Sequence, residues 1–136
     1  MSAELAKQAG YATPTEIQAK TLAPILAGGD VIARAPTGTG KTAAFVIPVI
    51  ERILRKEISR ALVIEPSREL TIQAANETRK IIGGAPLRAV AAYGGTPPER
   101  QEELIKQGAQ IVIGTPGRLR ELLQSGALKP GGVNCL

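Results

Sequence analysis

The 136-residue sequence contains no histidine and no tryptophan, a single cysteine, one phenylalanine and two tyrosines. The lack of histidine excludes Ser-His-Asp hydrolysis, histidine general-base catalysis and the common zinc sites. The single cysteine, Cys135, excludes an internal disulfide framework and a multi-cysteine metal site. So few aromatic side chains argue against a platform on which nucleic-acid bases stack. Any chemistry must therefore use Lys, Arg, Asp, Glu, Ser, Thr and backbone amides.

Long apolar runs are also missing. No stretch of about 18 apolar residues could span a membrane, and residues 1–7 have no apolar core of a secretory signal. We therefore expect a cytoplasmic protein. The length fits one domain, and 43% hydrophobic with 21% charged residues is typical of a folded globular chain. The net charge of +5 favours a polyanionic partner only weakly, because many ordinary proteins are as basic.

Four short apolar segments, each followed by a loop and a helical pattern, organise the chain. Near-continuous apolar runs of this length are typical of strands that are covered on both faces. Strand and helix patterns alternate, which predicts an α/β domain with a doubly wound parallel sheet. The expected strands are residues 30–34, 61–65, 88–92 and 110–114, and a fifth is expected to begin at Val133.

Threonine, serine and proline mark the expected helix starts. Thr13-Pro14-Thr15-Glu16 predicts a capping box with proline at the first helical position, and Thr96-Pro97-Pro98-Glu99 repeats the pattern. We also expect a helix from Ser67 to about Ile82 and one from Thr115-Pro116 to Gly126. An amphipathic helix is expected between residues 41 and 56.

Residues 35–42 read A-P-T-G-T-G-K-T, a variant of the phosphate-binding P-loop G-x-x-x-x-G-K-[ST] with Ala35 in place of the first glycine. Gly38 and Gly40 permit turns that point backbone amides inward, and the following helix adds its positive end. A plain glycine-rich turn is the alternative. It is less well supported, because an apolar strand pattern precedes the motif and an amphipathic helix follows it.

The residue types of this loop suit a nucleotide's phosphates and a magnesium ion. Lys41 can reach the β- and γ-phosphates, and the Thr42 hydroxyl can ligate Mg²⁺. We therefore expect Lys41 and Thr42 to serve catalysis and Thr42 to be the metal ligand. The residues expected to bind the nucleotide here are Thr37, Gly38, Thr39, Gly40, Lys41 and Thr42.

Four further segments accompany the P-loop: Gly10-Tyr11-Ala12-Thr13-Pro14-Thr15-Glu16-Ile17-Gln18, Pro66-Ser67-Arg68-Glu69-Leu70, Gly94-Gly95 and Thr115-Pro116-Gly117-Arg118. In this order they resemble the Q motif and the RNA-contact motifs of the DEAD-box ATP-dependent RNA helicases. Any one of them could arise by chance, but five in order at plausible spacings are specific. The resemblance spans about Gly10 to Leu136.

The resemblance implies a RecA-like P-loop NTPase domain that uses ATP and Mg²⁺ and binds RNA. It places Tyr11, Thr15 and Gln18 beside the nucleotide, where a glutamine amide can pair with adenine N6 and N7. The alternative is that Gln18 is an ordinary exposed glutamine on a helix, without a role in binding. The family's adenine-stacking aromatic falls at about Met1 here, so we expect weaker adenine binding.

The resemblance also implies contacts with the RNA backbone that do not depend on base sequence. For Ser67 and Thr115, helix capping alone is the alternative role. The residues implied to contact RNA are Pro66, Ser67, Arg68, Gly94, Gly95, Thr115, Pro116, Gly117 and Arg118.

The family's Asp-Glu-Ala-Asp and S-A-T motifs and its second RecA-like domain do not occur in these 136 residues. We therefore expect residues 1–136 to be a partial N-terminal RecA-like domain without ATPase or unwinding activity by itself. The S-A-T strand lies beside the P-loop strand in the family, so we expect the latter to lack a neighbour.

Two other readings remain. One is a natural short module that binds nucleotide or RNA without turnover. The other is a P-loop ATPase of another class, such as a DNA-directed helicase, although Gln18 and the segment from Thr115 to Arg118 weigh against it.

Overall fold

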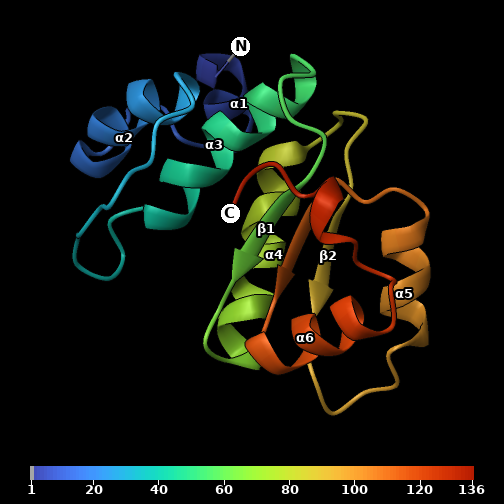
Figure 1. Ribbon diagram of the computed structural model, residues 1–136. Helices are drawn as coiled ribbons and strands as arrows, with labels where there is room; N and C mark the ends of the chain where they lie inside the picture. The colour runs from blue at the N-terminus through green and yellow to red at the C-terminus, as the bar shows by residue number, and fades with distance from the viewer. Residues whose placement is uncertain (1) are drawn as a thin grey trace.

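A computed structural model describes residues 2–136 and contains a parallel three-stranded sheet at its centre (Figure 1). The strands are β1 (Ala61–Ile64), β2 (Ala89–Ala92) and β3 (Ile111–Gly114), in the order β1-β3-β2. Parallel strands of one sheet need long crossover connections. The connection from β1 to β2 contains α4 (Arg68–Ile82), and the connection from β2 to β3 contains α5 (Glu99–Lys106). The α/β fold with a parallel sheet predicted from the sequence is confirmed.

The other helices are α1 (Ser2–Gln8), α2 (Glu16–Leu26), α3 (Lys41–Leu54) and α6 (Pro116–Gln124), followed by a 3-10 turn (Pro130–Gly132). Two predicted helix starts are confirmed. The Ser67 hydroxyl caps α4 by accepting a bond from the Leu70 amide at 3.2 Å, and Pro116 is the first residue of α6.

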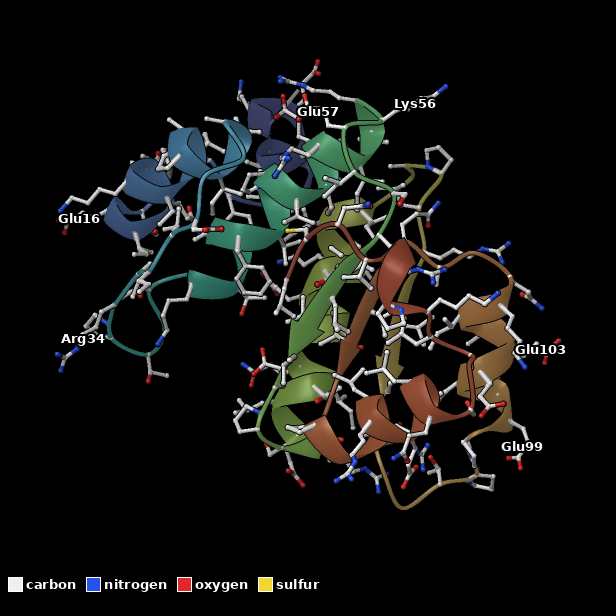
Figure 2. All side chains as sticks on the ribbon, viewed as in Figure 1. Glu16, Arg34, Lys56, Glu57, Glu99 and Glu103 are labelled. Carbon is white, nitrogen blue, oxygen red and sulfur yellow. The ribbon has the colours of Figure 1, made fainter. Side chains whose placement is uncertain are left out.

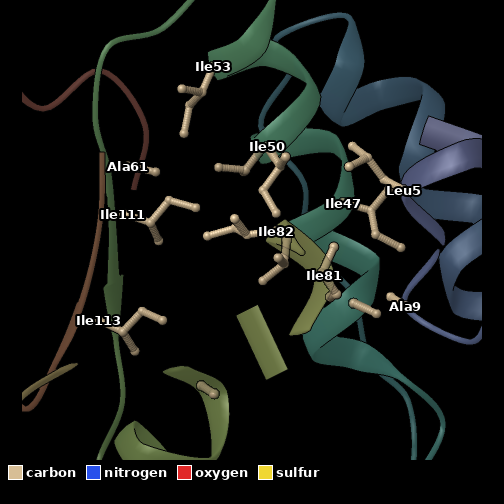
Figure 3. Close-up of a cluster of buried hydrophobic side chains, with 14 of the residues drawn as sticks. Leu5, Ala9, Ile47, Ile50, Ile53, Ala61, Ile81, Ile82, Ile111 and Ile113 are labelled. Atoms are coloured by element: carbon tan, nitrogen blue, oxygen red, sulfur yellow. The ribbon is translucent and has the colours of Figure 1, made fainter. Parts of the chain in front are cut away.

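Helices cover both faces of the sheet because successive side chains of a strand point to opposite sides. Ile111 and Ile113 of β3 pack into a cluster with α1, α3 and α4 (Figure 3). Val112, between them, joins a second cluster that α5 and α6 cover. The sheet is therefore doubly wound, as the uninterrupted apolar strands predict.

Two helix starts differ from the sequence prediction. α2 begins at Glu16 with Thr15 as its N-cap, rather than at Thr13-Pro14. The start is shifted because the Gln18 side chain caps the helix at Thr15: the Thr15 amide donates to Gln18 Oε1 at 3.0 Å. α5 begins at Glu99 after Pro98, and the carbonyl and hydroxyl of Thr96 instead bind side chains from α6 and α5.

The strand expected at residues 30–34 is absent. The chain between α2 and α3 is a loop without a strand, the Ile32 side chain is fully exposed, and Arg34 points outward from the loop (Figures 1 and 2). A strand persists only when a neighbour pairs with it. Beyond β1, however, the part of the chain that the structure describes adds only a single bridge to the sheet, between Ala61 and Cys135.

The fifth strand expected from Val133 is reduced to that bridge, in which the Leu62 amide donates to the Cys135 carbonyl at 2.9 Å. A groove of about 610 Å³ separates this edge from the loop at Asp30 and Val31. Within residues 2–136, no helix is both long and apolar enough to cross a membrane. A cytoplasmic location stays a prediction.

Candidate functional site

The P-loop leads into the N-terminus of α3. Gly38 and Gly40 both have φ of 80°, in the left-handed region that favours glycine, and Gly40 is the N-cap. The first helical bond is made by the Ala44 amide, which donates to the Gly40 carbonyl at 3.0 Å. The preceding amides of the first turn have no partner within the helix. Together with the helix dipole, they favour an anion at this position.

Lys41 and Thr42 are the first two residues of α3. Lys41 is exposed and forms no ion pair within the described part of the chain, while Thr42 is half-buried. Thr37 is exposed, and the Thr39 hydroxyl donates to the Pro36 carbonyl at 2.7 Å. The structure therefore gathers the predicted phosphate-binding residues at one helix end.

The N-terminus of α2 is fastened to the P-loop by two hydrogen bonds. The Thr15 hydroxyl donates to the Thr39 carbonyl at 2.8 Å, and Gln18 Nε2 donates to the Gly40 carbonyl at 3.2 Å. Gln18 is only 6% exposed, so the alternative of an exposed helix glutamine is wrong. A Cβ on Gly40 would collide with the Gln18 amide. The two predicted regions thus form one unit.

Tyr11 and Gln18 both line a pocket of about 180 Å³ between α1, α2 and α3. Its walls are otherwise mostly apolar, with Leu22, Ala44 and Ile47 among them. The Lys80 ammonium lies 5.8 Å from the centre of the Tyr11 ring. The structure brings Tyr11 close to Gln18, as expected. The position at which the family's adenine-stacking aromatic residue would fall, about Met1, lies outside the described residues.

A magnesium site built from several acidic side chains is not found in the described part of the chain: residues 2–136 contain no group of three or more His, Cys, Asp or Glu that could hold a metal ion. Magnesium is often held by one or two protein oxygens together with the substrate's phosphates. The Thr42 hydroxyl, on the first turn of α3, fits such a minimal arrangement.

The three expected RNA-contact segments follow the three strands. Residues 66–68 come after β1, residues 94–95 after β2, and residues 115–118 after β3. In a parallel sheet these carboxyl ends share one edge, where open α/β sheets bind their ligands. Ser67 and Thr115 are also the N-cap residues of α4 and α6. The Ser67 hydroxyl makes a capping hydrogen bond, whereas the Thr115 side chain makes none, so the capping role considered for both is confirmed for Ser67 alone.

Arg68 is an exposed cation at this edge. Its guanidinium lies over the ring of Tyr93, 4.8 Å from the ring centre. A Cβ on Gly95 would lie 3.5 Å from Arg68 Nη1, in ordinary contact. The loop after β1 therefore packs on the loop after β2, with a positive charge left facing solvent.

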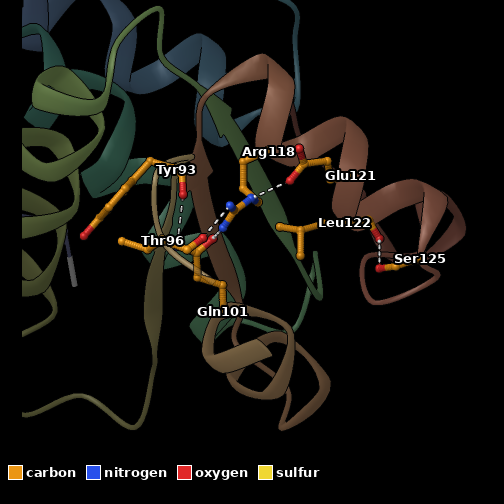
Figure 4. Close-up of polar contacts among 7 residues, drawn as sticks. All are labelled: Tyr93, Thr96, Gln101, Arg118, Glu121, Leu122 and Ser125. Atoms are coloured by element: carbon orange, nitrogen blue, oxygen red, sulfur yellow. Dashed lines mark hydrogen bonds and ion pairs between the residues drawn. The ribbon is translucent and has the colours of Figure 1, made fainter. Parts of the chain in front are cut away.

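Arg118 occupies a different environment from the other predicted RNA-contact residues, because it is only 6% exposed (Figure 4). Its Nη2 donates to the Thr96 carbonyl at 2.7 Å and its Nη1 to Gln101 Oε1 at 2.7 Å. Its Nε donates to Glu121 Oε2 at 2.8 Å. All three nitrogens of the guanidinium are engaged within the protein.

Gln101 of α5 was not expected from the sequence. It is buried, and its Nε2 donates to the Tyr93 carbonyl at 3.2 Å and to the Thr96 hydroxyl at 3.4 Å. The signal available in the sequence was its spacing from Ile105. These two residues lie four apart on the buried face of α5, where a polar side chain needs partners.

The carboxyl group of Glu65, at the end of β1, has a pKa raised above its ordinary value of 4.5 because burial penalises the charged form. The contribution of Glu65 to the free energy of unfolding is therefore most favourable below pH 4.5, where the carboxyl group is protonated. It is lost as the pH rises through the folded pKa, because the buried carboxyl group then becomes charged. We therefore expect Glu65→Gln to raise the melting temperature relative to wild type by an amount that grows between pH 4 and pH 7. Thermal unfolding at several pH values measures this. Glu99→Gln, an exposed control, should show no such trend, and a pH-independent difference for Glu65→Gln would contradict the prediction.

The doubly wound parallel sheet and the glycine loop at the start of α3 define a RecA-like P-loop domain. The chain belongs to the DEAD/DEAH box helicase family, which matches residues 15–133. It is 43% identical over 118 residues to the DEAD-box ATP-dependent RNA helicase RhpA of Helicobacter pylori (strain B128), covering 87% of this chain and 24% of the relative.

A solved structure shows the same fold. The crystal structure of a hypothetical ATP-dependent RNA helicase from Sulfolobus tokodaii superposes with a TM-score of 0.84 at 36% identity. The match covers 97% of this chain and 38% of that one. The chain therefore spans about a quarter of the length of RhpA and well under half of the solved helicase.

Proposed function

We propose that this chain is the ATP- and RNA-binding N-terminal part of a DEAD-box ATP-dependent RNA helicase, a partial RecA-like domain that acts with a second one. The observation that carries the proposal is the pair of hydrogen bonds from Thr15 and Gln18 to the P-loop carbonyls. A plain glycine-rich turn has no need of them. They join the segment implied to recognise adenine to the segment implied to hold phosphates.

The nucleotide would lie along this unit. The first-turn amides of α3 would bind its phosphates, with Lys41 as the neutralising charge and Thr42 as a ligand of Mg²⁺. Gln18 uses one N–H and one lone pair for Gly40 and Thr15 and keeps one of each. These suit adenine, which offers an acceptor at N7 and a donor at N6, whereas guanine offers two acceptors. We therefore propose selectivity for ATP over GTP.

The RNA would lie across the carboxyl edge of the sheet. Contacts from Arg68, from the capping segments at Ser67 and Thr115, and from Gly94, Gly95 and Gly117 would reach the sugar–phosphate backbone. Such contacts position a strand without reading its sequence. Pro66 and Pro116 would shape the turns on either side of the caps.

We further propose that the 136 residues bind without turning over ATP. Phosphoryl transfer needs groups that position the attacking water and neutralise the developing charge. Lys41 and Thr42 supply part of that set. Incubation with ATP and RNA should release phosphate no faster than the Lys41→Ala variant does.

The salt dependence of RNA binding tests the RNA half of the proposal. Each phosphate contact with single-stranded nucleic acid contributes about 0.7 to the slope of log affinity against log salt concentration. We expect Arg68→Ala to flatten that slope by about 0.7, measured by fluorescence anisotropy with labelled single-stranded RNA. The matched control is Arg79→Ala, since Arg79 is exposed and bonds the Ala89 carbonyl at the opposite end of β2. An unchanged slope for Arg68→Ala, or an equal change for Arg79→Ala, would refute the assignment.

A further inference from the structure

We propose that Gln101 and Arg118 are positioning residues for RNA binding, which hold the three strand-end loops as one preformed surface and do not touch RNA themselves. The assignment rests on the proposed RNA binding of this edge. It changes the role of Arg118 from a phosphate contact to an internal brace, and it adds a residue that lies outside every motif segment.

The bonds of Gln101 show why it can act as a junction. Its carbonyl oxygen accepts from Arg118 of α6 at 2.7 Å, while its amide nitrogen donates to the Tyr93 carbonyl at 3.2 Å. The same nitrogen lies 3.4 Å from the Thr96 hydroxyl. Tyr93 and Thr96 flank the Gly94-Gly95 pair. One buried side chain on α5 therefore holds both ends of the glycine loop and ties them to α6 (Figure 4).

Arg118 completes the brace from the other side. Its guanidinium bonds the Thr96 carbonyl as well as Gln101, and the carboxylate of Glu121 balances its charge. At 6% exposure it offers very little surface to a phosphate. Breaking these bonds to free the guanidinium would leave buried acceptors unpaired, which is costly. The geometry therefore favours a role in holding the loops over a direct contact with RNA.

The loop after β1, which carries Arg68, is joined to the other two through Tyr93. The carbonyl of Tyr93 is held by Gln101, and its ring carries the Arg68 guanidinium 4.8 Å from the ring centre. The exposed cation that would meet RNA is therefore placed by the same junction. Because loops that are already ordered lose less freedom on binding, such bracing strengthens affinity without adding a contact.

Gln101→Leu is the direct test, because leucine keeps the size of the side chain and removes all of these hydrogen bonds. We expect about a tenfold loss of affinity for single-stranded RNA. The slope against log salt should not change, because no phosphate contact is lost. ATP affinity should also stay at the wild-type value, because the bonds from Thr15 and Gln18 to the P-loop are untouched. Gln124→Leu, at an exposed position of α6, is the matched control and should bind RNA normally.

Arg118 separates bracing from direct contact. Arg118→Lys keeps a positive charge but cannot make the same fork of bonds, so we expect weaker RNA binding with an unchanged slope. Arg118→Ala should likewise leave the slope unchanged, whereas Arg68→Ala flattens it. A slope flattened by about 0.7 in Arg118→Ala would overturn the assignment and restore a direct phosphate contact.

The outcomes distinguish this inference from the function on which it rests. If the wild-type protein binds no RNA, the proposed function fails and the bracing role fails with it. If the wild type binds RNA and Gln101→Leu binds equally well, only the bracing role is overturned. Should Gln101→Leu lose ATP affinity through misfolding, Arg118→Lys provides the decisive measurement, and normal RNA affinity in that variant would refute the proposal.

Discussion

Lys41→Ala is expected to weaken ATP binding by about ten- to a hundredfold. A hydrogen bond to a charged group contributes about 1.5–3 kcal/mol, and the Lys41 ammonium is the one positive side chain in the first turn of α3. The amides of that turn remain in the variant, so binding should weaken without being abolished. The loss should be much smaller for AMP, which lacks the β- and γ-phosphates that this ammonium is expected to reach.

Isothermal titration with Mg-ATP and with AMP measures the effect. Lys129→Ala is a suitable control, because Lys129 is also exposed but is the N-cap of the 3-10 turn and not part of the P-loop or α3. Equal ATP affinity in wild type and Lys41→Ala would remove the P-loop from the nucleotide site. Equal losses for ATP and AMP would mean that Lys41 contacts the α-phosphate or the nucleoside.

The strands that the sequence predicts correctly share one property: each pairs with a strand that is also present. β1, β2 and β3 match the expected segments to within one residue at each end. Ile111 and Ile113 point to one cluster and Val112 to the other, so the uninterrupted apolar pattern of this strand correctly predicts that both of its faces are buried. Local sequence is sufficient in such cases, because the neighbour that the strand needs follows from the same pattern.

Residues 30–34 show the limit of that reasoning. Asp-Val-Ile-Ala-Arg has the composition of a buried strand, yet Ile32 is fully exposed in a loop. Pairing is a property of two segments, and the sheet on this side ends with the single bridge at Cys135. No feature within five residues could reveal whether a partner lies beside them.

The candidate site divides in the same way. The position and turn geometry of the P-loop were predictable, because Gly38 and Gly40 must adopt left-handed conformations there and the motif fixes their spacing. The attachment of Gln18 to the Gly40 carbonyl was not, since it depends on how α2 packs against α3. Arg118 likewise is a cation in the sequence, and only its contacts with Gln101 and with the Thr96 carbonyl show that it is buried.

Gly114→Ala is expected to destabilise the fold by about 2 kcal/mol or more, as overpacking of a close-packed core does. Gly114 ends β3, the central strand, and a Cβ there would lie 2.6 Å from Leu119 Cδ2 and 2.8 Å from the Ala92 carbonyl oxygen. Leu119 is buried, and the Ala92 carbonyl accepts the Thr115 amide, so neither can move without disturbing its neighbours. A methyl group would therefore push α6 away from the sheet.

Urea unfolding of Gly114→Ala measures that loss, with Gly84→Ala as the control. A Cβ at Gly84 meets nothing within 4 Å, and its φ lies outside the left-handed region, so its stability should stay within about 0.5 kcal/mol of wild type. Displacement of α6 also moves the segment from Thr115 to Arg118 relative to Gln101. RNA affinity should consequently fall in Gly114→Ala even at urea-free conditions where the protein remains folded, while ATP affinity is retained. Unfolding curves that coincide with those of wild type would show that α6 can shift without a loss of stability. The close fit of β3 to α6 would then not determine the position of the segment from Thr115 to Arg118.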